Sequence, residues 1–299
     1  MVRRYRPRRI ALGVAVLVLA GCVQTAMLLR DRPPPLDLLE VVEAPELRRD
    51  SLRVALRAAG TFAVTLSARP DTLAPPELVV LDPDVATVDD VRALRRAGSL
   101  TLAYVNVGER EAYRPWAGRV DTAWTLADNP DWPGHTFVDA REPGWQELVR
   151  GTAVRRALGI GADGVFLDML DVAEAVPETR PGMLALVRAI RADHPERLVV
   201  ANRGLALLPE LDPALDGLLV ESVWARTGAD GVARATDPEE RDRLVAALRG
   251  FRERTGGAAL ALDYPGDVPG LADAARAGAR AADLPIFLGR RSLGAAPAP

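Results

Sequence analysis

The sequence predicts an α/β fold, a (β/α)₈ or TIM barrel that an N-terminal signal or anchor segment precedes. Short apolar runs alternate with stretches of helical periodicity, and this order is typical of parallel βαβ units. Eight or so such units in roughly 240 residues is the usual size of a barrel of this kind. A dinucleotide-binding open sheet is the alternative, but no Gly-x-Gly-x-x-Gly motif follows the first apolar run.

Nine apolar runs are candidate strands, and five stretches have the periodicity of helices. The runs are Phe62–Leu66, Leu78–Leu81, Leu100–Val107, Thr136–Val138, Val165–Leu167, Leu198–Ala201, Gly217–Val220, Ala258–Leu262 and Ile286–Leu288. The helical stretches are Leu47–Ala59, Val88–Ala97, Gly144–Leu158, Gly182–Ala192 and Glu239–Thr255. Nine strands are one more than the barrel holds, so either Thr136–Val138 or Ile286–Leu288 is expected to lie outside its wall.

The N-terminal segment has the features of an export signal. An arginine-rich start precedes the apolar stretch Ile10–Ala20, and Leu19-Ala20-Gly21-Cys22 resembles a bacterial lipobox. Cys22, the single cysteine, is therefore the expected lipidation site. Because apolar residues continue to Leu29, an uncleaved membrane anchor is the alternative. Both interpretations export the domain and tether it to the outer face of the cytoplasmic membrane or to the cell envelope, and we favour the lipoprotein.

Domain boundaries follow from these features. We expect a lipoprotein signal peptide over residues 1–22 (or an anchor to about residue 29), a linker over 23–46, the barrel domain over 47–292, and a disordered tail over 293–299. The linker contains Pro33-Pro34-Pro35, which makes it a stiff spacer of polyproline character.

Composition excludes several classes of protein. The chain has no lysine, which excludes Schiff-base aldolases and P-loop NTPases. Two histidines are too few for a His-rich metal site, and one cysteine excludes internal disulfides and zinc ribbons. The net charge of −3, with both signs interspersed, gives no nucleic-acid footprint. If the protein is a hydrolase, its acid and base are therefore expected to be carboxylates. We also expect a monomer without cofactor or metal.

Polar side chains close almost every candidate strand. In Gly161–Asp171 the apolar run stops on Asp168, with Asp171 just beyond it. The other polar residues at or just after strand ends are Asp82, Tyr104, Asn106, Glu109, Asp139, Asn202, Arg203, Glu221, Asp263 and Tyr264. Taken singly, each is explained as a helix cap or a loop residue. Because the carboxyl ends of barrel strands meet at one mouth, together they predict an acidic cleft that suits a carbohydrate.

Aromatic residues gather beside this predicted cleft. Three of the five tryptophans lie in the loop Gly108–Gly134, and long loops on compact domains are often functional. Trp116 and Trp132 are candidates for stacking on sugar rings, whereas Trp145, at a predicted helix start, is expected in the core. His135 is interpreted as structural, because the start of a barrel strand faces away from the mouth.

Several motifs together resemble one known family. They are Ala103-Tyr-Val-Asn-Val-Gly-Glu109, Tyr113-Arg114, Asn129–Gly134, Asp139, Trp145 and Gly161–Asp171, with the strand ends Ala201-Asn202, Val220-Glu221 and Asp263-Tyr264-Pro265. This set, which spans about Phe62 to Leu288, is similar to the endo-α-1,4-polygalactosaminidases of glycoside hydrolase family 114, including the cysteinyl-tRNA-synthetase-related extracellular proteins. One departure is Thr61–Leu66, which lacks the Trp and Gln that relatives tend to carry near the first strand, so the outer sugar subsites stay open.

The resemblance implies a TIM barrel that cleaves α-1,4-linked galactosamine polymers with two carboxylates. These map onto Asp168 and Glu221, and the sequence leaves open which is the nucleophile and which the acid/base. The residues that it implies for the mouth are Asp82, Tyr104, Glu109, Asp139, Asn202 and Tyr264. A carboxylate-lined groove would attract a cationic polymer.

Three hypotheses follow. A tethered glycosidase predicts that Asp168 and Glu221 face each other, about 5–5.5 Å apart if retaining and about 6.5–9.5 Å apart if inverting. A non-catalytic polysaccharide-binding lipoprotein on the same scaffold predicts sugar binding without hydrolysis. A hydrolase dependent on a divalent metal would use Asp82, Asp139 and Asp168, since hard cations need only oxygen ligands.

Overall fold

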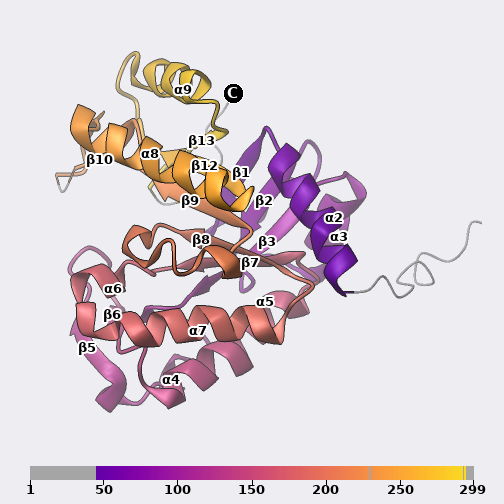
Figure 1. Ribbon diagram of the computed structural model, residues 1–299, viewed down its shortest axis with the longest axis vertical. Coiled ribbons are helices and arrows are strands. Elements are labelled where there is room, and N and C mark those ends of the chain that lie inside the picture. The colour runs from indigo at the N-terminus through magenta and orange to yellow at the C-terminus, as the bar shows by residue number, and fades with distance from the viewer. Residues whose placement is uncertain (1–44, 229, 292, 294–299) are drawn as a thin grey trace, which may run out of the picture. The chain divides into compact units, whose positions relative to one another are not determined.

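A barrel of eight parallel strands forms the centre of the computed structural model, which describes residues 45–228, 230–291 and 293 (Figure 1). In sheet order the strands are β1 (Phe62–Thr65), β2 (Leu78–Leu81), β3 (Leu100–Asn106), β7 (Gly164–Asp168), β8 (Leu198–Asn202), β9 (Gly217–Glu221), β12 (Ala258–Asp263) and β13 (Ile286–Leu288). Each predicted run except Thr136–Val138 matches one of them to within one residue at either end. The predicted TIM-barrel fold is confirmed, whereas the predicted export segment with Cys22 lies outside the described residues.

The C-terminal segment completes the closure of the barrel. Among the described residues, paired strands run from β1 through to β13, and no backbone ladder joins these two ends. The rings of Phe62 and Phe287 instead meet across the gap, with centroids 5.9 Å apart. Beyond β13, the carbonyl oxygen of Leu293 accepts hydrogen bonds from the backbone nitrogens of Leu66 and Ser67, at 2.8 and 3.4 Å. Leu293 is thereby held at the mouth.

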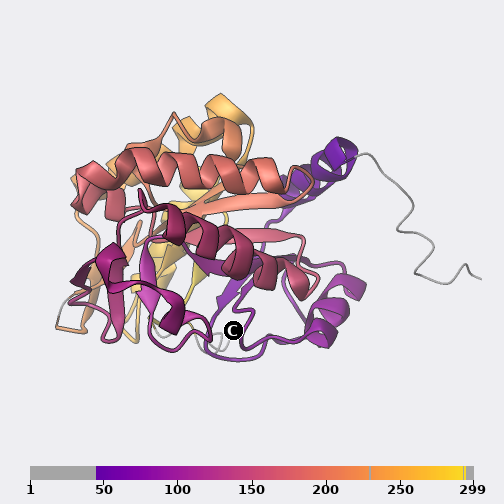
Figure 2. The same ribbon diagram turned by 90° about the horizontal axis from the view of Figure 1, so that it is seen from below.

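Helices cover the outer face of the barrel. They are α3 (Val88–Arg96), α4 (Pro143–Leu148), a π-helical turn (Val149–Val154), α5 (Arg155–Gly159), α6 (Val172–Ala175), α7 (Arg180–Asp193), α8 (Pro238–Thr255) and α9 (Leu271–Ala282). Helix α7 runs beside the continuous rod of α4 and α5 (Figures 1 and 2). The sequence did not predict α9, because its buried stripe of Leu271, Ala275 and Ala279 is built mainly from small residues. Within the described residues, no helix is both long and apolar enough to cross a bilayer.

Helix α2 (Pro45–Ala58) closes the N-terminal end of the barrel. Leu56 and Ala59 join the apolar cluster that fills the barrel interior. Two arginines of α2, Arg49 and Arg53, and Arg191 of α7 form ion pairs with the carboxylate of Asp216, whose side chain is completely buried. These contacts fix the bottom of the barrel and leave the opposite end open.

Residue parity decides which side chains reach the mouth. Successive side chains of a strand point to opposite faces, and Tyr104, Phe166 and Leu262 lie in the interior cluster. Their neighbours, such as Val105 and Leu167, pack beneath the helices. An inward residue at a strand's carboxyl end therefore opens into the mouth, while an adjacent polar residue does not.

The strand β6 (His135–Val138) is the run that lies outside the barrel wall. It forms an antiparallel sheet with β4 (Glu109–Glu111) and β5 (Thr125–Asp128), in the order β4, β6, β5. In the β4–β6 register, Glu109 pairs with Phe137 and Glu111 pairs with His135. The predicted functional loop Gly108–Gly134 contributes β4 and β5 to this small sheet, and β6 directly follows the loop. A second hairpin, β10 (Ala225–Thr227) with β11 (Ala233–Ala235), follows β9.

Candidate active site

A cavity of about 930 Å³ opens at the carboxyl ends of the barrel strands. Its volume is within the range of ligand-binding sites in proteins. Ten of the residues predicted for the site line it: Asp82, Tyr104, Glu109, Trp132, Asp168, Asp171, Asn202, Arg203, Glu221 and Tyr264. The barrel therefore brings most of the polar strand ends to one place.

Asp168 and Glu221 face each other at the centre of this cavity. The side-chain nitrogen of Asn202 donates to Oδ1 of Asp168 at 2.8 Å and to Oε1 of Glu221 at 2.6 Å. The two accepting oxygens cannot be farther apart than these two distances combined. That limit agrees with the separation of about 5–5.5 Å in retaining glycosidases and is below the roughly 6.5–9.5 Å of inverting ones.

Two tyrosines hold the outer oxygens of this pair. The hydroxyl of Tyr104 lies 3.0 Å from Oδ2 of Asp168, and that of Tyr264 lies 2.6 Å from Oε2 of Glu221. Burial and the nearby carboxylates raise the pKa of both tyrosines well above the usual value, so both stay protonated. Each carboxylate is thus fixed by donors and has little freedom to rotate.

The proton affinity of Asp168 is unusually high. Burial, followed by the charge of Glu221, raises its pKa to about 7. Hydrogen bonds from Asn202 and from the backbone nitrogen of Met169 oppose this shift without cancelling it. Burial also raises the pKa of Asp171, against the opposing charge of Arg203. The carboxylate pair therefore keeps one proton up to about pH 7, a property of general acids.

A left-handed backbone conformation occurs at the residue directly after each of three central residues. Met169, Arg203 and Ser222 have φ values of 65°, 56° and 61°, and they directly follow Asp168, Asn202 and Glu221. Left-handed conformations of such residues cost about 1–3 kcal/mol each and cluster at functional sites. Here they turn the chain sharply at the ends of β7, β8 and β9 and leave the last strand residue facing the cavity.

Gly108 lies against the turn that carries Asp168. A Cβ at this position would lie 2.2 Å from the carbonyl oxygen of Met169. We expect Gly108→Ala to displace the turn, lowering kcat about 10²-fold and the free energy of unfolding by about 1–3 kcal/mol. Kinetics and urea unfolding measure these effects. Gly118→Ala is the control, because its Cβ would meet no atom within 4 Å; equal behaviour of the two variants would contradict the prediction.

A buried arginine organises one wall of the cavity. Arg114 forms ion pairs with Asp82 at 2.8 Å, Asp84 at 2.9 Å and Glu111 at 2.7 Å. Glu111 also accepts a hydrogen bond from Tyr113 at 2.6 Å. Although burial opposes ionisation, Arg114 and Arg156 hold the pKa of Asp84 below its usual value. The acids of this wall are therefore largely neutralised by arginine.

A second buried carboxylate, Glu109, holds a histidine at the cavity. Its oxygens contact Asn129 at 2.6 Å, Nδ1 of His135 at 3.0 Å and Asn106 at 3.3 Å. The hydrogen bond to Glu109 is the main cause that raises the pKa of His135. His135 lines the cavity, so its predicted position at a barrel strand start, away from the mouth, was wrong. It belongs to β6, which is not a barrel strand.

Four predicted residues lie elsewhere. Trp116 is 6% exposed and packs against the core residue Trp145, with ring centroids 6.1 Å apart. Asp139 follows β6 and binds Arg141 at 2.6 Å. Asp263 has the opposite parity to Tyr264, and its carboxylate accepts from the backbone nitrogens of residues 223–225. Asn106 has the inward parity of Tyr104 but is buried and does not line the cavity; its side-chain nitrogen donates to Glu109 and Tyr104.

Other cavity residues were not predicted. They are Asp84, Glu111, Tyr113, His135, Phe137, Met169 and Arg291, among others. Glu109, Glu111 and Tyr113 are spaced two apart, a strand-like signal that was available in the sequence. Arg291 lies beyond the last strand, and its guanidinium stacks on Trp132, 5.1 Å from the ring centroid. No local sequence pattern predicts that contact.

Fewer unpaired acids line the cavity than the sequence predicts. Asp82, Asp84, Glu109 and Glu111 are paired with arginine or histidine, and Asp139 and Asp263 do not line the cavity. Within the described residues, the lining acids without such an ion pair are Asp131, Asp168, Asp171 and Glu221.

The described residues contain no group of three or more side chains suited to holding a metal ion. The acids proposed for a metal site, Asp82, Asp139 and Asp168, are not brought together.

Comparisons with known proteins agree with this geometry. The sequence model of glycoside-hydrolase family GH114 matches residues 44–294. A protein of Deinococcus radiodurans is 31% identical over 235 residues, covering 73% of this chain and 74% of the relative. The glycoside hydrolase domain of PelA from Pseudomonas aeruginosa is 26% identical, with a TM-score of 0.69 over 79% of this chain and 97% of that domain. Ega3 of Aspergillus fumigatus, solved with galactosamine, is 17% identical and shares the fold, with a TM-score of 0.67 over 80% of this chain and 94% of its own.

Proposed function

We propose, from the premise that this chain belongs to glycoside-hydrolase family GH114, that it hydrolyses an amino-sugar polysaccharide of the α-1,4-polygalactosamine class. The observation that carries the proposal is the close pair of Asp168 and Glu221, which Asn202 bridges at the barrel mouth. A scaffold that only bound sugar would have no need for two carboxyl groups held in this geometry, one of them with a raised pKa.

The geometry supports a two-step, retaining reaction. The ionised carboxylate of the pair attacks the anomeric carbon, while the protonated one transfers its proton to the leaving oxygen. A covalent glycosyl-enzyme forms as the glycosidic bond breaks. The second carboxyl group, now ionised, then removes a proton from water, whose oxygen attacks the anomeric carbon and releases the first carboxylate. Asn202, Tyr104 and Tyr264 hold both groups in position throughout.

The choice of an amino sugar rests on charge and on relatives. Asp171 and the Asp168–Glu221 pair lack ion-pair partners in the described part of the chain, so the ionised groups among them would attract the ammonium group of a deacetylated sugar. The similar Ega3 structure holds galactosamine. Trp132 and Tyr113, which are 42% and 63% exposed at the rim, offer faces on which sugar rings stack.

Hydrolysis is expected to decline as the pH rises above about 7. The pKa of Asp168 is raised to about 7 by burial and by Glu221, so the pair loses its last proton there. Without that proton, no general acid is left for the leaving oxygen. Measurement of kcat from pH 5 to pH 9 on one polymer checks this; a rate that keeps increasing to pH 9 would contradict it.

Release of new reducing ends tests the function. The purified protein is incubated with polygalactosamine, other cationic polysaccharides and neutral polysaccharides, with Glu221→Gln as the control. We expect reducing ends from the galactosamine polymer with the wild type and almost none with the variant. Binding without hydrolysis by the wild type would instead support a polysaccharide-binding protein. Activity that is unchanged after chelation of divalent metals would exclude the metal-dependent alternative.

The tether is also proposed, on the sequence alone. The lipobox-like Leu19–Cys22 supports an exported lipoprotein attached through Cys22. Cys22→Ser is expected to release the protein from the membrane fraction, or to leave an unprocessed precursor of higher mass. Mass spectrometry of the mature N-terminus measures this. Normal membrane attachment of an unmodified variant would favour an uncleaved anchor.

A further inference from the structure

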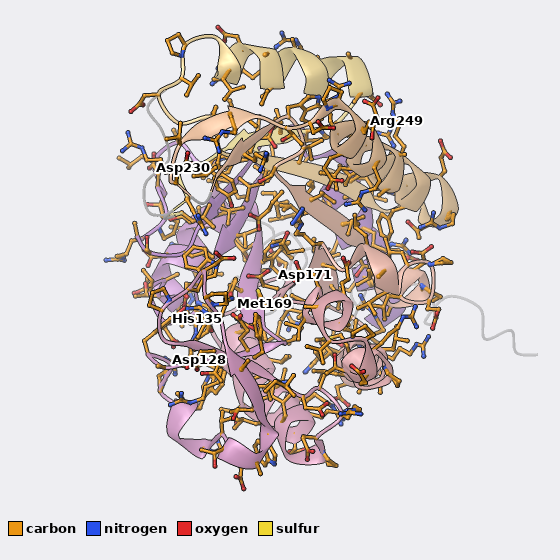
Figure 3. All side chains as sticks on the ribbon, turned by 90° about the vertical axis from the view of Figure 1, so that its left-hand side faces the viewer. Asp128, His135, Met169, Asp171, Asp230 and Arg249 are labelled. Atoms are coloured by element: carbon orange, nitrogen blue, oxygen red, sulfur yellow. The ribbon has the colours of Figure 1, made fainter. Side chains whose placement is uncertain are left out.

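We propose that His135 determines specificity in this cavity, by binding an acetamido carbonyl oxygen of the polymer and by disfavouring an ammonium group beside it. The inference rests on the proposed function for the identity of the polymer. The position of the histidine rests on geometry alone. His135 and Asp171 lie apart in Figure 3, with Met169 between them.

The imidazole is oriented by one of its two nitrogens. Nδ1 lies 3.0 Å from Oε2 of Glu109, a carboxylate that is 1% exposed and is also held by Asn129 and Asn106. This contact fixes Nδ1 as a donor. Among the described residues, no protein group forms a hydrogen bond with Nε2. The side chain is 16% exposed and lines the cavity, so Nε2 is the nitrogen that remains for a ligand.

Aromatic rings flank the histidine on two sides. The ring centroid of Tyr113 lies 5.9 Å from that of His135, and the centroid of Trp132 lies 6.1 Å from it. Both rings are partly exposed at the rim of the cavity. Sugar-binding sites combine an aromatic face for the ring carbons with a polar group for the substituents. The three side chains supply both features in one place.

The charges around His135 disfavour an ammonium group. From β4, Glu109 and Glu111 face the imidazole, and both are engaged in ion pairs. Arg114 lies in the loop after β4, and its charge opposes protonation of the histidine. The guanidinium of Arg291 stacks on Trp132, which contacts His135, and within the described part of the chain Asp131 is the one cavity-lining acid of the loop Gly108–Gly134 that forms no ion pair.

Protonation of the imidazole determines this selectivity, because a neutral ring with its hydrogen on Nδ1 would present Nε2 as an acceptor. Glu109, with a smaller contribution from Glu111, raises the pKa of His135, so the imidazolium form extends to higher pH. In that form Nε2 carries a hydrogen and donates to an oxygen. The ammonium groups of the polymer are thereby directed to Asp168, Asp171 and Glu221. We infer that the two regions of the cavity recognise different substituents of the sugar chain.

Proton NMR of the histidines tests the proposal without requiring hydrolysis. The chain has only two histidines, and His194, at the end of α7, is an internal control outside the cavity. The protein is purified without a polyhistidine tag and titrated with N-acetylgalactosamine or with galactosamine. We expect the acetylated sugar to shift the ring signal of His135 and to raise its pKa, while His194 stays unchanged. No shift, or an equal shift with galactosamine, would overturn the proposal.

Kinetics of two variants supply a second readout. His135→Leu is expected to raise KM for a partly acetylated polymer about tenfold, with a smaller change in kcat. His135→Gln keeps an uncharged donor and should recover part of the loss. A KM that is unchanged in His135→Leu would overturn the assignment. If the sugar shifts His135 but no polymer is cleaved, the proposed hydrolysis fails while the binding role of His135 stands.

Discussion

Asp168→Asn is expected to lower kcat about 10⁴-fold, because removal of a nucleophile or of its acid partner leaves only the binding contribution. The fold should persist, since the amide replaces the carboxylate in its hydrogen bonds. Its oxygen still accepts from Asn202 and Met169, and its nitrogen donates to Tyr104, whose hydroxyl then donates to Glu111 at 3.3 Å. Reducing-end release and thermal unfolding measure the two properties.

The variant should also be more stable than the wild type at high pH. The pKa of Asp168 is about 7 in the folded protein and about 3.9 in an unfolded chain. Folding therefore favours the protonated form, and the wild type loses stability as the pH rises from about 4 to about 7. Asp168→Asn removes this dependence, so its melting temperature should exceed that of the wild type above pH 7.

Asp139→Asn is the matched control for Asp168→Asn. The sequence placed Asp139 at the mouth, whereas the structure pairs it with Arg141 outside the cavity. Its variant should keep normal activity. Full activity in Asp168→Asn, or loss of activity in Asp139→Asn with normal stability, would refute the assignment of the site.

Replacement of Arg114 is expected to have the largest effect on stability. Arg114→Leu would leave Asp82, Asp84 and Glu111 without their buried cation. Removal of one partner from such a buried network costs about 3–5 kcal/mol. Urea unfolding at pH 7 measures the free energy of unfolding, and a loss below about 1 kcal/mol would contradict the prediction.

The pH dependence of this loss separates charge from packing. Arg114 and Arg156 lower the pKa of Asp84, so ionised Asp84 stabilises the wild type above its unfolded pKa, and this contribution disappears as the pH falls. Arg114→Leu should therefore approach the wild type only below pH 4, as the pH falls through the lowered pKa of Asp84. Arg114→Lys is the control, because it keeps the charge without the planar fork, and we expect an intermediate loss. A deficit in Arg114→Leu that does not shrink between pH 7 and a pH well below 4 would indicate lost packing instead.

The barrel and its central pair, Asp168 and Glu221, could be predicted from the sequence. Apolar runs followed by Asp168, Asn202, Glu221 and Asp263-Tyr264 predict strands that are buried inside the barrel and end at its open mouth. The family resemblance is confirmed by the GH114 match. Parity was also available: Asp263 and Tyr264 are adjacent, so only one of them can face the mouth.

The wall of the cavity could not be predicted from the sequence in the same way. Strands β4 and β5 have three and four residues, and their pairing with β6 depends on contacts that local periodicity does not record. His135 was misplaced because its strand was assigned to the barrel, and Trp116 because a tryptophan in a long loop resembles a sugar platform. The stacking of Arg291 on Trp132 joins residues far apart in the chain. Such contacts come from tertiary structure rather than from sequence pattern.

The stereochemistry of the first product tests the central claim most directly. Proton NMR during the first turnovers on an α-1,4-linked galactosamine polymer reports the anomeric form of each new reducing end before it equilibrates. Because Asn202 holds Asp168 and Glu221 within the separation of retaining enzymes, we predict that the α-anomer appears first. Initial release of the β-anomer, or no new reducing ends at all, would contradict the account.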